Sequence, residues 1–216
     1  MSQGTNKTLI QCDFDGTITI EDVSFALLDA FADGDWRQIL REHEQGKMTV
    51  GEFNSRAFAL VKAPKESLLK VANGNIEVRP GFDEMLSYCR RKDFRFVVVS
   101  NGLDFYIREI LRKHGAKDIE VYAAKTWFHP DCLKVQYIGP DGTCLDRDFK
   151  VAYVNSFLQE DYRIIYMGNG TSDIEPAKQC RHIFATGNLL NKLKQTNHPC
   201  TPFEDFHEVV KVLEQL

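Results

Sequence analysis

The chain has 216 residues, of which 43% are hydrophobic and 27% charged. This composition is typical of globular proteins and excludes a disordered or collagen-like chain. Because 27 Lys and Arg residues stand against 31 Asp and Glu residues, the net charge is −4, and there is no basic excess to coat a nucleic acid or an anionic membrane surface. The length predicts one domain, or one domain with an inserted lobe.

The cysteines and the N-terminal residues bear on the cellular compartment. Six cysteines are spread along the chain without a Cys-x-x-Cys pair, which indicates reduced thiols rather than a disulfide framework. The N-terminal segment is short and polar, and no run approaches the ~18 apolar residues of a membrane span. We therefore expect a cytoplasmic monomer or homodimer with no nucleic-acid or membrane partner.

Short apolar runs alternate with helical patterns over most of the chain. The first run, 8–12, leads into the sequence Asp-Phe-Asp-Gly-Thr, and further strands are predicted at 94–100, 119–123, 162–167 and 182–185. Helical spacing covers 82–91, 105–113, 149–158, 174–180 and 203–216. This alternation predicts an α/β fold, a three-layer, Rossmann-like core with helices on both faces of a parallel sheet. A hairpin with a Gly-Pro-Asp-Gly turn is predicted between 135–138 and 143–145.

The stretch 21–78 interrupts this alternation, because it has helical spacing and no convincing strand. Four helices are predicted there, at 24–31, 36–43, 49–61 and 65–71, and Thr49 to Glu52 resembles a capping box. A crossover needs only about a dozen residues. We therefore expect a core of 1–20 and 79–216 and a small all-helical cap, 21–78, inserted after the first strand. We expect this cap to form a lid over the active site, and the alternative is an insertion with a purely structural role.

Polar residues lie at the ends of the predicted strands, where open α/β sheets bind their ligands. They are Asp13 and Asp15 after the first strand, Ser100-Asn101-Gly102 after the second, Lys150 before the fourth, and 168–173 after the fourth. Each feature alone has an ordinary explanation, as a capped turn, a common turn or a surface lysine. Their conjunction in this order predicts an active site.

The four segments resemble the four motifs of the haloacid dehalogenase superfamily of phosphohydrolases. Residues 12–19 resemble the first motif, 100–102 the second, Lys150 the third and 168–173 the fourth, so that the resemblance spans nearly the whole chain. The 18 positions from Lys150 to Gly168 hold one helix and one strand, as that fold requires. The stretch 21–78 is similar to the cap of the phosphoserine-phosphatase-like branch.

The resemblance implies hydrolysis of a small phosphorylated metabolite, a phosphomonoester, through an aspartyl-phosphate intermediate. It makes Asp13 the nucleophile, Asp15 the general acid and base, and Lys150 a point charge between the phosphate and Asp13. The substrate-binding residues that it implies are Ser100, Asn101, Gly102, Asp22 and Arg56.

The resemblance also implies Mg²⁺ bound by the Asp13 carboxylate, the Asp15 backbone carbonyl and Asn169, with Asp173 beside the metal or recruited to it. The chain departs from the family here, because the family usually has Asp at the position of Asn169. An amide supplies an oxygen but no charge, so we expect weaker Mg²⁺ binding unless Asp173 ligates the metal directly. A catalytically weakened regulatory or binding protein of this fold is the alternative to an active enzyme.

The chain resembles two branches of the family, and each branch implies a different substrate. Phosphoserine phosphatases carry Glu where this chain has Asp22, and an Arg for the substrate carboxylate where it has Arg56; for both residues the alternative is a solvated helix face. Residues 13–19, 55–60, 102–106 and 203–206 look closer to 2-hydroxy-3-keto-5-methylthiopentenyl-1-phosphate phosphatases of methionine salvage.

Those enzymes often have a Cys-rich segment before the third motif. Here Cys132, Cys144 and His129 stand in that segment. A zinc site made of these three residues would lack a fourth protein ligand.

Overall fold

The computed structural model describes residues 7–74 and 76–216. The chain divides into two compact units. The first consists of Met1–Ile20, Val78–Val99 and Lys150–Leu216, and the second of Glu21–Glu77 and Ser100–Phe149. The second unit therefore contains residues 21–77 of the predicted cap together with residues 100–149.

The first unit contains a parallel sheet. β1 (Thr8–Cys12) lies between β2 (Arg95–Leu103) and β6 (Arg163–Gly168), and β6 is followed by β7 (His182–Ala185) and β8 (Thr201–Pro202). All five residues of β1 are buried, which is typical of a central strand with both faces covered. The sheet confirms the predicted α/β fold class.

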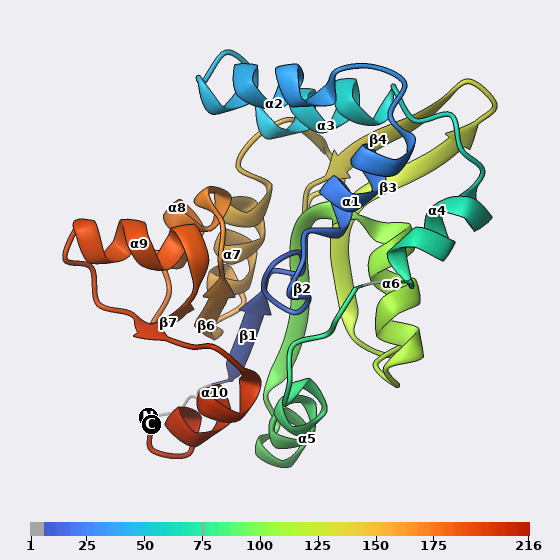
Figure 1. Cartoon of the computed structure of the whole chain (residues 1–216). Coiled ribbons are helices and arrows are strands. Elements are labelled where there is room, and N and C mark those ends of the chain that lie inside the picture. The colour runs from blue at the N-terminus through green and yellow to red at the C-terminus, as the bar shows by residue number, and fades with distance from the viewer. Residues whose placement is uncertain (1–6, 75) are drawn as a thin grey trace. The chain divides into compact units, whose positions relative to one another are not determined.

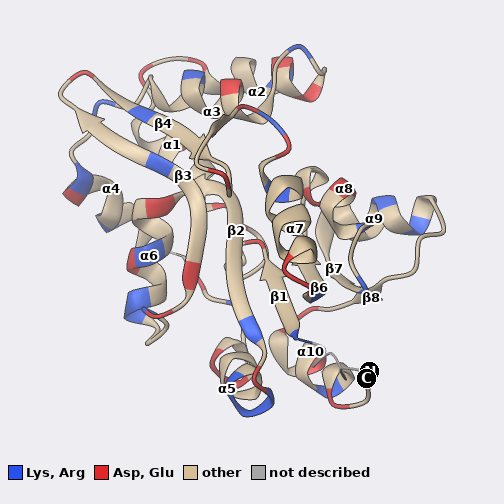
Figure 2. Cartoon of the chain, turned by 180° about the vertical axis from the view of Figure 1, so that it is seen from behind, with Lys and Arg blue, Asp and Glu red and all other residues tan. Residues whose placement is uncertain are grey.

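Helices connect and flank these strands (Figure 1). They are α5 (Phe82–Lys92), α7 (Phe149–Gln159), α8 (Ile174–Ala177), α9 (Gly187–Gln195) and α10 (Phe206–Leu213), with a 3₁₀ turn at Thr171–Asp173. α5 packs against α10. α5 has acidic residues in its first turn and three basic residues in its last, coloured in Figure 2, an arrangement that complements the helix dipole.

The second unit contains the four helices predicted after the first strand, and they are confirmed. They are α1 (Val23–Phe31), α2 (Trp36–Glu44), α3 (Val50–Phe58) and α4 (Lys65–Ala72). The predicted capping box is present: the Thr49 hydroxyl accepts from the Glu52 amide at 3.1 Å, and the Glu52 carboxylate accepts from the Thr49 amide at 2.7 Å. α1 packs on α4, and α2 on α3.

The rest of the second unit is a helix and an antiparallel meander. α6 (Asp104–Lys113) packs on β3 (Glu120–His129), which pairs with β4 (Cys132–Ile138), and β4 pairs with β5 (Cys144–Leu145). The predicted hairpin is thus confirmed as β4 and β5, and β3 is longer than the predicted strand. The hydrogen-bonded order of the described strands is β5-β4-β3-β2-β1-β6-β7-β8.

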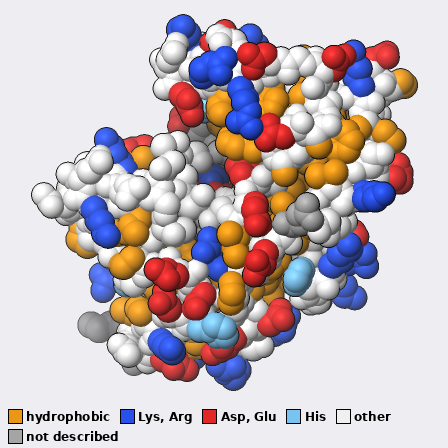
Figure 3. Space-filling view, viewed as in Figure 1, with side chains coloured by type: hydrophobic (Ala, Val, Ile, Leu, Met, Phe, Trp, Pro, Cys, Tyr) orange, Lys and Arg blue, Asp and Glu red, His pale blue; other side chains and the backbone are white. Residues whose placement is uncertain are grey.

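Acidic and basic side chains are interspersed on the face shown in Figure 3, as their similar numbers in the sequence lead one to expect. None of the helices formed by residues 7–74 and 76–216 has the length and apolar character of a membrane span.

Candidate active site

The chain makes a compact turn directly after β1. The backbone oxygen of Phe14 accepts hydrogen bonds from all three amides of residues 17–19, at 2.8 to 3.1 Å. Gly16 has a φ of +74°, and a Cβ there would lie 2.2 Å from the Asn169 side-chain nitrogen. Both the backbone conformation and the close approach therefore require glycine at this position.

Three charged side chains are buried together beside this turn. Asp13 follows β1, Lys150 lies in the first turn of α7, and Asp173 ends the 3₁₀ turn after β6; their exposed fractions are 6%, 3% and 0%. The Lys150 ammonium nitrogen lies 2.8 Å from one oxygen of Asp13 and 2.6 Å from one oxygen of Asp173. The fold thus brings together three of the residues that the sequence predicts for the site.

The Asp173 carboxylate is surrounded by donors from the protein itself. One oxygen accepts from Lys150 and from the Tyr166 hydroxyl at 2.7 Å. The other accepts from the backbone amides of Asn169 at 3.1 Å and Gly170 at 2.8 Å. Asp173 therefore fixes both the lysine and the loop after β6. Sequence reasoning missed Tyr166, because a tyrosine inside a buried strand looks like an ordinary core residue.

The three charges shift one another's pKa values. Burial, followed by the charge of Asp173, raises the pKa of Asp13 to about 7, although contact with Lys150 opposes this shift. Burial alone would lower the pKa of Lys150, but the two carboxylates outweigh it and raise that pKa. The lysine therefore stays charged, and its charge favours the ionised form of Asp13.

The metal ligands that the sequence predicts are all oxygen atoms, which suit a hard cation. The sequence predicts the Asp13 carboxylate, the Asp15 carbonyl and the Asn169 amide oxygen as ligands, and oxygens of this kind are what Mg²⁺ prefers. The Asn169 oxygen accepts a hydrogen bond from the Thr17 hydroxyl at 2.9 Å. Among residues 7–74 and 76–216, no three His, Cys, Asp or Glu side chains are grouped to hold a metal ion. The donor set thus fits Mg²⁺ in kind, with a single carboxylate and two neutral oxygens.

The predicted phosphate-binding residues Ser100, Asn101 and Gly102 belong to the second unit. The structure continues β2 through Leu103, so the strand extends three residues beyond its predicted end at Ser100. The Ser100 hydroxyl, which is 1% exposed, accepts a hydrogen bond from the Gly102 amide at 3.0 Å. Ser100 therefore holds the end of its own strand.

Two residues that the sequence reasoning missed fix Asn101. Its backbone oxygen accepts from the Asn54 amide at 3.0 Å and from the Tyr137 hydroxyl at 2.5 Å, and Asn54 also donates to the Tyr137 oxygen. The side-chain oxygen of Asn101 is buried and has no hydrogen-bond partner within the described part of the chain. A buried Asn inside a helix is a signal that points to Asn54, since asparagine is unfavourable there without a partner.

The other two predicted substrate-binding residues make local contacts in the second unit. Asp22 caps α1, where its carboxylate accepts from the Phe25 amide at 2.9 Å. Arg56 lies on α3 with its side chain 54% exposed and 3.3 Å from Glu42. These contacts suit helix ends and faces in solvent, and a substrate-binding role for either residue stays a prediction.

His129, Cys132 and Cys144 do not converge. His129 is paired with Cys132 across the β3–β4 ladder, whereas Cys144 is paired with Ile138 at the other end of β4. Ile138 lies six positions after Cys132 along β4, a length of about 20 Å. One zinc ion cannot contact all three side chains.

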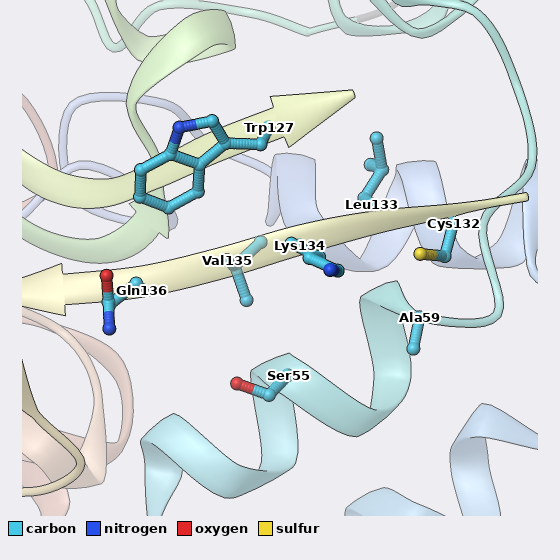
Figure 4. A pocket seen from close by; sticks show the side chains of 8 residues that line it. All are labelled: Ser55, Ala59, Trp127, Cys132, Leu133, Lys134, Val135 and Gln136. Carbon is cyan, nitrogen blue, oxygen red and sulfur yellow. The ribbon is translucent and has the colours of Figure 1, made fainter. Parts of the chain in front are cut away.

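A groove lies between α3 and the β3–β4 hairpin, with a volume of about 490 Å³ (Figure 4). Its lining residues are Ser55, Ala59, Trp127 and the five residues 132–136. Ser55 lies on α3, and Ala59 directly follows the last residue of this helix. None of the predicted catalytic, metal-binding or substrate-binding residues lines this groove.

Comparison with known proteins gives one family and two sets of relatives. The family model for haloacid dehalogenase-like hydrolases matches residues 10–178. A 2-hydroxy-3-keto-5-methylthiopentenyl-1-phosphate phosphatase from Brevibacillus brevis is 26% identical over 98% of this chain and 97% of its own length. One of the same name from Bacillus cytotoxicus is 28% identical over 96% of each.

The solved structures with a similar fold include phosphoserine phosphatases. A phospho-aspartyl intermediate analogue of phosphoserine phosphatase has a TM-score of 0.73 and 20% identity, over 96% of this chain and 99% of the other. A substrate-bound phosphoserine phosphatase complex has a TM-score of 0.70 and 20% identity, over 95% and 98%. At this identity the similarity shows the fold alone.

The family match covers the turn after β1, Lys150 and Asp173, which are the parts of the chain that form the buried charged cluster. The family predicted from the sequence is therefore confirmed: this chain belongs to the haloacid dehalogenase-like hydrolases.

Proposed function

We propose that the chain is a phosphomonoester phosphatase and that Asp13 is its nucleophile. The observation that carries this proposal is the buried contact of Lys150 with both Asp13 and Asp173 in a chain of this hydrolase family. A carboxylate held at the end of a strand beside a fixed cation is suited to attack a phosphoryl group, because the cation offsets the repulsion between two anions.

The reaction has two steps at phosphorus. In the first, an Asp13 oxygen forms a bond to phosphorus while the bond to the leaving oxygen breaks, and Asp15 gives that oxygen its proton. In the second, Asp15 takes a proton from water, the water oxygen attacks phosphorus, and the bond to Asp13 breaks. Inorganic phosphate leaves, and both carboxyl groups return to their starting state.

Mg²⁺ is the cofactor that we propose, held by the Asp13 carboxylate, the Asp15 carbonyl and the Asn169 amide oxygen. When bound, the ion supplies positive charge next to the phosphoryl oxygens. The four donors around Asp173 favour a positioning role for this residue over direct ligation. Because Asn169 is neutral, we expect the site to bind Mg²⁺ more weakly than one with Asp in its place.

The substrate that we propose to test first is 2-hydroxy-3-keto-5-methylthiopentenyl-1-phosphate, from the names of the relatives in Brevibacillus brevis and Bacillus cytotoxicus. In this proposal the phosphate is held by residues 100–102, and the remainder of the substrate by a cap, 21–78, that carries Asp22 and Arg56. All six cysteines are free thiols in the structure, which supports a cytoplasmic site of action.

Turnover of p-nitrophenyl phosphate with Mg²⁺ tests the proposed activity, with an Asp13→Asn variant as the control. A panel of phosphorylated metabolites, including the ketopentenyl phosphate and phosphoserine, then ranks substrates by kcat/KM. Preference for the ketopentenyl phosphate supports the proposed substrate, and preference for phosphoserine replaces it. Absence of turnover on every ester, with a folded protein and excess Mg²⁺, contradicts the proposed function.

A further inference from the structure

Arg79 holds the turn after β1 through its guanidinium group, although no motif points to this residue. Its Nε donates to the Thr17 carbonyl at 2.8 Å, and its Nη2 donates to the Gly16 carbonyl at 2.9 Å. The two acceptors are the residues that directly follow Asp15. A planar guanidinium has donors in a rigid fork, so it can fix two successive carbonyl groups at once.

The third donor of Arg79 joins the turn to the C-terminal segment. Its Nη1 donates to the Glu204 carbonyl at 2.7 Å, and the guanidinium lies over the Phe203 ring, 5.6 Å from the centroid. The carbonyl of Pro80, the residue after Arg79, accepts a hydrogen bond from the Phe206 amide at 2.9 Å. Phe203 and Glu204 therefore contact the guanidinium, and Phe206 contacts the backbone of the residue that follows Arg79.

The backbone of Arg79 is tied to the same turn. Its amide donates to the Ile18 carbonyl at 2.8 Å, and Thr19 forms an antiparallel bridge with Val78. The chain leaves the first unit after Ile20 and returns to it at Val78. Arg79 is thus placed where these two connections meet, with both its backbone and its side chain bonded to residues 16–18.

We propose that Arg79 is a positioning residue, which fixes the peptide groups after Asp15 and thereby the carboxyl group that protonates the leaving oxygen. This inference rests on the proposed phosphatase activity. Without the guanidinium, the Gly16 and Thr17 carbonyls lose their shared donor, and the backbone that follows Asp15 is held less firmly. Proton transfer should then suffer more than attack by Asp13, which lies before the turn.

The leaving group of the substrate separates these two effects. A p-nitrophenolate ion departs without a proton, whereas the alkoxide of benzyl phosphate needs one from a general acid. The quantity to compare is kcat/KM, because it covers only the steps up to departure of the leaving group and excludes the hydrolysis step that both substrates share. For Arg79→Ala we expect kcat/KM on benzyl phosphate to fall about 100-fold, and kcat/KM on p-nitrophenyl phosphate to fall less than about tenfold. Guanidinium ion added to this variant should restore turnover of benzyl phosphate in part.

Two further variants make the result decisive. Arg79→Lys keeps a positive charge but lacks the rigid set of guanidinium donors, so it should also lose more activity on benzyl phosphate than on p-nitrophenyl phosphate. This variant replaces Arg79→Ala in the test if Arg79→Ala does not fold. Arg95→Ala is the matched control: Arg95 lies over the rings of Phe157 and Tyr162 and contacts Glu160, and its variant should keep the wild-type ratio of the two rates.

The possible outcomes test the role of Arg79 separately from the proposed phosphatase activity. An equal loss of kcat/KM on both substrates, or no loss, in folded Arg79 variants overturns the positioning role and leaves the phosphatase activity standing. A wild-type protein that hydrolyses neither ester overturns the proposed function, and the role of Arg79 with it.

Discussion

The Thr17 hydroxyl donates a hydrogen bond to the Asn169 side-chain oxygen over 2.9 Å. This bond joins the turn after β1 to the loop after β6, and Gly16 allows the close approach. A carboxylate at position 169 would accept the same bond, so the local structure does not require an amide. The neutral side chain therefore has its main effect on the charge of the predicted metal site.

Asn169→Asp should tighten metal binding by about tenfold or more, because it adds a negative charge at a predicted ligand. The measurements are the Mg²⁺ concentration for half-maximal turnover and direct Mn²⁺ binding by electron paramagnetic resonance. Ser172→Asp, in the same loop and exposed, is the control for added charge alone. Equal Mg²⁺ and Mn²⁺ affinities in the wild type and Asn169→Asp would exclude Asn169 as a ligand, and activity gained from none would favour a regulatory role for the natural chain.

Lys150→Met should destabilise the fold by about 3–5 kcal/mol, because it leaves two buried carboxylates without their cation. The loss should be smaller at low pH, since a proton on Asp13 then removes one of the two charges. Urea unfolding at several pH values measures both effects. Lys178→Met, which removes an exposed pair with Glu175, should cost less than about 1 kcal/mol; similar losses for the two lysine variants would argue against a coupled buried cluster.

Arg56→Ala should raise KM for a substrate with a carboxylate or carbonyl group more than KM for p-nitrophenyl phosphate. The reason is that, in the proposed function, the cap sets substrate choice while the core carries out the phosphate chemistry. Arg41→Ala, which removes another exposed arginine paired with an acidic residue, should leave both KM values unchanged. If Arg56→Ala raises both KM values equally, the role of Arg56 is structural.

His182 should make stability depend on pH. Burial lowers its pKa below the ordinary value of 6.5, and its ring shares a hydrogen bond with the Thr201 hydroxyl at 3.0 Å. The unfolded chain then binds more protons than the folded one, so stability is retained above pH 6.5 and lost as pH falls toward the folded pKa. His182→Gln should flatten this part of the curve in denaturant titrations, whereas an exposed control, His114→Gln, should not; an unchanged slope in His182→Gln contradicts the assignment.

The elements that were predicted well carry strong local signals. The four helices of 21–77 begin where apolar spacing and residues such as Asp22 and Thr49 favour a helix start, and both residues cap their helices in the structure. Helix α9 and strand β8 were missed for physical reasons. α9 starts at Gly187, whose φ is +53°, and β8 has two residues, too few to show an alternating pattern.

The candidate site likewise contains residues that could be predicted from the sequence and residues that could not. Asp13, Lys150 and Asp173 could be predicted to meet, because the ends of parallel strands and the helices beside them share one edge of the sheet. Tyr137, Asn54 and Arg79 could not, since their roles come from contacts with residues that are distant in the sequence. Tyr166 could not either, because a tyrosine in a buried strand looks like an ordinary core residue. Sequence patterns identify the residues with chemistry more readily than the residues that hold them in place.

The most direct test of the proposed mechanism is to locate the phosphoryl group on the enzyme. Wild-type protein is mixed with p-nitrophenyl phosphate and Mg²⁺, quenched in acid within the first turnover, digested, and examined by mass spectrometry. The account predicts one phosphoryl group on Asp13 in the wild type and none in a folded Asp13→Asn variant, which should also lack turnover. A phosphoryl group on another residue, or near-native turnover by Asp13→Asn, would contradict it.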